Sequence, residues 1–141
     1  MLLKYTVQNK AEAGTYALPF QVTEQEIVLS TLIIPAGEAE GHILIEVSLA
    51  WENPLLNWDI GELDIRLRRN DEQGPVLDWL QDSCYQEGFA ELSYEETAQQ
   101  AETHVYCLTV QSADHRAVVT GPLMMRGSVY VDQMDDNPDE Q

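Results

Sequence analysis

The chain has few basic residues. Only 7 of its 141 residues are lysine or arginine, against 25 aspartates and glutamates, so its formal net charge at pH 7 is -18. Binding to nucleic acid depends on Lys and Arg displacing the counterions of phosphate groups, and the same sign of charge disfavours anionic membrane surfaces. The composition therefore excludes nucleic acid and leaves cations, basic proteins, neutral sugars or further copies of the chain as partners.

Long apolar runs are also missing. No segment approaches the about 20 apolar residues that span a bilayer, and the opening MLLKYTVQN lacks the apolar core and small-residue cleavage site of a secretion signal. We expect no membrane insertion and no signal-directed export. The sequence leaves the compartment open between the cytoplasm and a surface that is reached by another route.

Cysteine is scarce. Cys84 and Cys107 are too few for a disulfide framework and lack the close spacing of a zinc site. Three interpretations stay open: two small buried apolar side chains, a disulfide between neighbouring strands, or a reactive or metal-binding role.

Catalytic motifs are absent. There is no P-loop, no G-x-G-x-x-G and no serine in a G-x-S-x-G elbow. The histidines His42, His104 and His115 lack the H-x-H or H-E-x-x-H spacing of a metal site. We therefore expect no enzyme, metal or cofactor, with a small hydrolase on the same scaffold as the remaining catalytic hypothesis.

What the chain does have is apolar residues at a spacing of two, which is typical of strands with one buried face. Residues 42–51 and 61–69 show it best, and further strands are predicted at 26–34, 76–81, 90–94, 104–111, 117–120 and 123–131. Residues 95–102 are predicted to form a loop or a short helix. The turns between these segments favour one all-β domain over residues 1–131, a sandwich or barrel, followed by an acidic disordered tail at 132–141.

Three stretches resemble the tumour necrosis factor-like jelly roll, which is shared with the globular heads of complement proteins. These are the strand ending in LAW with the later IRLRR, the strand VYCLTV, and the closing VVTGPLMMRG. The chain is also similar to small spore-surface proteins of spore-forming bacteria. The resemblance implies a two-sheet jelly-roll sandwich of about eight to ten strands that forms a homotrimer and serves as a structural surface component.

A trimer needs an apolar face that is not used by the core. The segments 105–110 and 123–125 are apolar on both faces, so we expect Tyr106, Leu108 and Met124 to contact neighbouring copies. The alternative is a central strand buried under a loop. Three copies would carry a large negative charge, which must stay outside or be neutralised.

The loop 51–59 supports a different function. It places two tryptophans beside carboxylates and amides, the groups that stack on sugar rings and bind their hydroxyls. A carbohydrate-binding sandwich would use Trp51, Glu52, Asn57, Trp58 and Asp59. The alternative is that Trp51 ends a core strand and Trp58 caps the sandwich. The clustered Arg66, Arg68 and Arg69 are expected on a polar sheet face, paired with carboxylates.

Overall fold

The computed structural model describes residues 1–12, 14, 18–54, 60–100 and 102–132. In this part of the chain nine strands follow one another, with a single turn of 3₁₀ helix, η1 (Ala36–Glu38), before β4. The strands are β1 (Leu2–Ala11), β2 (Phe20–Val22), β3 (Ile27–Ile34), β4 (Gly41–Glu52), β5 (Gly61–Arg69), β6 (Val76–Cys84), β7 (Glu87–Ala98), β8 (His104–Gln111) and β9 (Ala117–Val131). No helix among these residues is long and apolar enough to cross a membrane.

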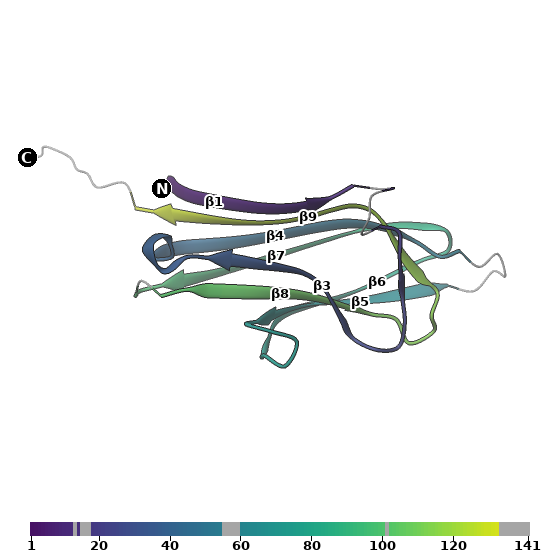
Figure 1. Ribbon diagram of the computed structural model, residues 1–141. Helices are drawn as coiled ribbons and strands as arrows, with labels where there is room; N and C mark the ends of the chain where they lie inside the picture. The colour runs from purple at the N-terminus through teal and green to yellow at the C-terminus, as the bar shows by residue number, and fades with distance from the viewer. Residues whose placement is uncertain (13, 15–17, 55–59, 101, 133–141) are drawn as a thin grey trace, which may run out of the picture.

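The strands form two antiparallel sheets that face each other (Figure 1). One sheet has the order β1-β9-β4-β7, with β2 pairing the other end of β9, and the other has the order β3-β8-β5-β6. Strands next to each other in the chain mostly lie in opposite sheets, so the connections cross between the layers. This is the order of a jelly roll, and it confirms the predicted all-β two-sheet sandwich.

The period-two pattern of β4 and β5 lines the space between the sheets, as predicted. Inward residues of both strands are at most 3% exposed: Ile43, Ile45, Val47, Leu49, Trp51, Leu63, Ile65 and Leu67. Burying a large aliphatic side chain contributes about 1.5–3 kcal/mol relative to leaving it exposed. The two strands therefore supply much of the core.

Four features of the fold differ from the sequence prediction, and one of them is the short strand β2, which was not predicted. β1 was not predicted, because its first residues include exposed Leu2 and Leu3 and it is an edge strand held only by β9. Residues 95–98 extend β7 instead of leaving the sheet, because they pair with the start of β4. The two segments 117–120 and 123–131 form the single strand β9, which bulges at Gly121, where φ is 90°.

Candidate functional site

Trp51 is a core residue. It occupies the last inward position of β4, is 1% exposed, and donates a hydrogen bond from Nε1 to Asp82 Oδ2 at 2.8 Å. Gly88 packs directly on the indole, since a Cβ there would lie 2.5 Å from Nε1. This burial corrects the expectation that Trp51 offers a ring face to a sugar.

Of the remaining residues of the predicted sugar-binding loop, Glu52 lines a cavity together with Trp51, and the other three lie outside the described residues. Glu52 is half-buried and lines a cavity of about 490 Å³ with Glu87 and the exposed Phe89. Asn57, Trp58 and Asp59 lie outside the described residues, so a role for them stays a prediction.

The residues predicted to form a trimer interface do not share a free surface. Tyr106 and Leu108 are both 0% exposed because they point between the two sheets. Met124 is half-buried on the outer face of the other sheet, opposite Ser48. Tyr106 and Leu108 are thus corrected to core residues, and trimer formation itself stays a prediction.

The two cysteines are free. Cys84 pairs with Gly61 and Cys107 with Arg68, so they lie seven residues apart along β5, about 23 Å at about 3.3 Å per residue. A disulfide needs Cα atoms within about 7 Å, so the disulfide hypothesis is wrong. Burial raises the pKa of both thiols, which disfavours the reactive thiolate.

The outer face of the four-stranded sheet carries an exposed tryptophan among polar side chains. Trp79 is 56% exposed and lies on edge strand β6, opposite Arg66 of β5, which in turn lies opposite Thr109 of β8. The next row across the same strands is Gln81, Asp64 and Gln111. We call this surface the Trp79 face; it comprises Asp64, Arg66, Trp79, Gln81, Thr109 and Gln111.

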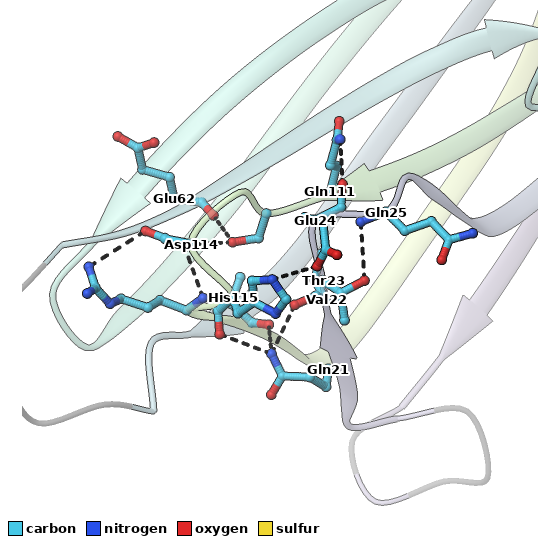
Figure 2. Close-up of polar contacts among 12 residues, drawn as sticks. Gln21, Val22, Thr23, Glu24, Gln25, Glu62, Gln111, Asp114 and His115 are labelled. Atoms are coloured by element: carbon cyan, nitrogen blue, oxygen red, sulfur yellow. Dashed lines mark hydrogen bonds and ion pairs between the residues drawn. The ribbon is translucent and has the colours of Figure 1, made fainter.

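Contacts to neighbouring residues hold this face in one arrangement. The Arg66 guanidinium lies over the Trp79 ring, 5.7 Å from its centroid, and donates to Gln111 Oε1 at 2.8 Å. The Gln111 amide nitrogen donates in turn to the carbonyl oxygen of Glu24 at 2.7 Å, as Figure 2 shows. These contacts hold the Arg66 guanidinium over the Trp79 ring. The Trp79 side chain stays 56% exposed beside it.

The backbone under Gln111 is itself anchored at the turn between β8 and β9 (Figure 2). Asp114 Oδ1 accepts hydrogen bonds from the Ser112 hydroxyl and from the Arg116 backbone N–H. Gln21 donates to the carbonyl oxygens of Val22, His115 and Ala117, which ties β2 to this turn. The sequence analysis did not identify this network, whose partners are up to 96 residues apart.

A paired glutamate borders the Trp79 face. Glu26 accepts hydrogen bonds from Arg68 Nε at 2.7 Å and Arg68 Nη2 at 3.0 Å, and from the Thr109 hydroxyl. The hydrogen bond from Arg68, against an opposing effect of burial, lowers the pKa of Glu26. Glu26 therefore stays ionised at neutral pH.

A second polar cluster lies between the sheets at the end of β5. We call it the inner cluster; it comprises Arg69, Tyr94, Glu96, His104 and Tyr106. Glu96 accepts hydrogen bonds from Arg69 Nη2 at 2.5 Å, from the Tyr94 hydroxyl at 3.3 Å and from the Tyr106 hydroxyl. Arg69 also lies over the Tyr106 ring, 5.6 Å from its centroid.

Glu96 and Tyr106 of the inner cluster are unsuited to acid–base catalysis. Burial and the hydrogen bond to Glu96 raise the pKa of Tyr106, so its hydroxyl stays protonated. Burial raises the pKa of Glu96, but hydrogen bonds from Tyr106 and Arg69 outweigh it and lower that pKa overall. Glu96 and Tyr106 are thus each held in the form that they already have at neutral pH, whereas a general acid or base needs a pKa near the working pH.

No metal centre was found in the described part of the chain, where no three His, Cys, Asp or Glu side chains are placed to hold an ion.

The sequence offered one overlooked signal for the Trp79 face. A turn at 70–75 folds β6 back on β5, which places Trp79 beside the alternating polar residues 64, 66 and 68.

No family model and no curated protein matches the chain. Among solved structures it is similar to the CBM22-1 xylan-binding domain from Paenibacillus barcinonensis Xyn10C, with 11% identity over 91% of this chain and 83% of that one, at a TM-score of 0.35. It is also similar to an arabinose-bound α-L-arabinofuranosidase, MgGH51, with 14% identity over 89% of this chain and 22% of that one and a TM-score of 0.36. The VP2 subviral particle of infectious bursal disease virus has 10% identity over 92% of this chain and 37% of that one, with a TM-score of 0.28. With every TM-score below 0.5, these likenesses decide nothing about function.

Proposed function

We propose that the protein is a non-catalytic module that binds neutral oligosaccharides on the Trp79 face. The observation that carries this proposal is the exposed indole of Trp79, 56% exposed on a polar strand surface and held by Arg66. An indole offers a large rigid apolar surface on which the apolar face of a sugar ring stacks.

The polar groups around Trp79 complement sugar hydroxyls. Gln81 is exposed beside it, and Asp64 is a half-buried carboxylate directly opposite Gln81 on β5. Amides both donate and accept hydrogen bonds, and a carboxylate accepts them, so the face can bind either end of a hydroxyl dipole. This mixture of one aromatic anchor and a few polar groups is typical of ligand sites.

The charge of the chain selects among glycans. At a formal net charge of -18, the protein repels uronates and sulfated sugars over a distance of about a Debye length. Neutral chains carry no such cost. We therefore expect neutral oligosaccharides to bind and polyanionic ones to bind weakly or not at all at low salt.

Calorimetric titration with xylo-, cello-, manno- and arabino-oligosaccharides tests the proposal. We expect saturable binding of at least one of them and a loss of about tenfold or more in affinity for Trp79→Ala, which is about 1.4 kcal/mol. Phe89→Ala is the matched control, because Phe89 is equally exposed, at 58%, but lies on the other sheet. Heat changes at the level of dilution for the whole panel, or equal affinity for Trp79→Ala, would exclude this site.

A further inference from the structure

The inner cluster borders a cavity that the Trp79 face does not use. The cavity has a volume of about 520 Å³ and is lined by Arg69, Glu96 and His104, with Asn70, Gln99 and Thr103 among the residues at its rim. Pockets for small molecules typically have volumes of about 300–1,000 Å³. Trp79 lies opposite Arg66 on the outer face of the sheet. Arg69, three residues after Arg66 on β5, points to the inner face. The two sites are therefore separate.

The tautomer of His104 follows from its partner. Its Nδ1 atom lies 3.2 Å from Arg69 Nη1, and a guanidinium only donates hydrogen bonds. Nδ1 must therefore accept, which places the ring proton of neutral His104 on Nε2. A proton on Nδ1 would point at the Arg69 N–H, and Glu96 Oε2, at 3.7 Å, is too far for a good hydrogen bond in its place.

The Nε2–H group of His104 has no partner. The residue is 8% exposed, and its Nε2 atom is buried with no acceptor among the described residues. A buried polar group without a hydrogen bond is rare in folded proteins and calls for an explanation. Since His104 lines the cavity, an acceptor atom of a ligand bound in that cavity could be the missing partner of Nε2–H.

The surroundings of the cavity favour a neutral ligand. Arg69 is already neutralised by Glu96, with a nitrogen–oxygen distance of 2.5 Å. Most other lining residues carry amides or hydroxyls; Ala98 is apolar, and Glu102 adds a negative charge. An anion would meet two carboxylates and the negative field of the whole chain. A ligand with several hydroxyl groups instead accepts from Nε2–H and donates to the amide and carboxylate oxygens.

We propose that this cavity binds a single neutral sugar or polyol, one of whose hydroxyl oxygens accepts a hydrogen bond from His104 Nε2–H. The proposal does not rest on oligosaccharide binding by the Trp79 face. Nε2 is not accessible to solvent in this structure, so the side chains that cover it must move to admit the ligand.

The His104 ring proton gives a direct test. Because Nε2–H is shielded from solvent, its signal should be observable in ¹H–¹⁵N spectra of the labelled full chain, with an ¹⁵N shift that reports the tautomer. Titration with D-glucose, D-galactose, D-xylose and glycerol should give, for at least one probe, a saturable downfield shift of this proton. No saturable shift with any of the probes, or a response to sodium acetate alone, would overturn the proposal.

Variants separate this site from the Trp79 face. We expect His104→Phe, which keeps an aromatic ring but removes the donor, to lower the calorimetric affinity for the responding probe by about tenfold or more. Trp79→Ala should leave that affinity unchanged. Equal affinity in folded His104→Phe contradicts the proposal. If that variant does not fold, the wild-type spectrum decides, because the shift of the His104 proton needs no substitution.

Discussion

Two consecutive arginines, Arg68 and Arg69, make almost the same contacts on opposite sides of one sheet. On the outer side Arg68 binds Glu26, which also accepts from the Thr109 hydroxyl. On the inner side Arg69 binds Glu96, which also accepts from the hydroxyl of Tyr106. Strand geometry alone separates them, since successive side chains of a strand point to opposite faces.

The two pairs differ in what surrounds them. The exposed side-chain fractions are similar, 17% and 22% for Arg68 and Glu26 against 26% and 18% for Arg69 and Glu96. However, burial has the largest single effect on the pKa of Glu96, whereas the hydrogen bond from Arg68 has the largest effect on that of Glu26. Burial thus weighs more on Glu96 than on Glu26, so the inner pair lies in the more desolvated site although the exposed fractions are similar.

The largest effect is expected from a charge placed on the inner side. Leu108→Glu puts a carboxylate at a position that is 0% exposed, and we expect a loss of about 4 kcal/mol or more in the free energy of unfolding. Ile33→Glu adds the same charge on the outer side of that sheet, at a position 54% exposed, and should change it by about 0.5 kcal/mol or less. Urea denaturation measures both.

The same samples test self-association. Light scattering on the wild type and on Ile33→Glu gives the solution mass, and the predicted trimer requires about three times 15.9 kDa. If folded Leu108→Glu dissociated a trimer without loss of stability, the placement of Leu108 in the core would be contradicted.

The next effect comes from removing one glutamate of each pair. Glu96→Ala leaves Arg69 without its carboxylate in a desolvated site, and we expect a loss of about 3 kcal/mol or more. Glu26→Ala leaves Arg68 with a second hydrogen-bond acceptor, the Gly74 carbonyl oxygen, so the expected loss is about 1 kcal/mol. Thermal unfolding at pH 7 compares them, and equal losses would show that the inner and outer environments do not differ.

The inner cluster also predicts an alkaline dependence of stability. The pKa of Tyr106 is raised in the folded protein by burial and by Glu96. The pKa of an unfolded tyrosine is about 10. Above that pH the unfolded state releases a proton that the folded state retains, so stability falls as pH rises. Tyr106→Phe should flatten this fall above about pH 10. Tyr85→Phe, at an exposed position, should not.

The smallest effect on stability is expected on the Trp79 face itself. Trp79→Ala removes an exposed ring and its contact with Arg66, and an exposed cation–π contact contributes about 0.5–1 kcal/mol. The unfolding free energy should therefore fall by no more than about 1 kcal/mol, while glycan binding is lost. A much larger loss of stability would assign Trp79 a structural role instead.

The sequence predicts correctly those strands that have one fully apolar face. The prediction fails where pairing with a neighbouring strand decides whether a segment belongs to the sheet. The bounds of β8 agree with the prediction of 104–111. The end of β7 reads Glu-Glu-Thr-Ala, which has weak strand preference, and only its pairing with β4 keeps it in the sheet. Arg69 was grouped with Arg66 and Arg68, although alternation along β5 already points it inward.

Sites are harder to predict than strands for the same reason. The inner cluster joins side chains of β5, β7 and β8, and no spacing within one strand indicates that they meet. Trp51 was expected to bind a ligand because tryptophan and carboxylates are adjacent in its loop, but its position at the inward end of β4 buries it. Trp79 was overlooked because it lies alone in the returning strand of a hairpin.

The most direct test of glycan binding is to locate it by chemical-shift mapping in ¹H–¹⁵N spectra with the tightest-binding neutral oligosaccharide. The account predicts that the largest changes fall on the indole N–H of Trp79 and on the side-chain amides of Gln81 and Gln111. Changes confined to the other sheet, to residues 55–59 or to the inner cluster would contradict the Trp79 face as the glycan-binding surface.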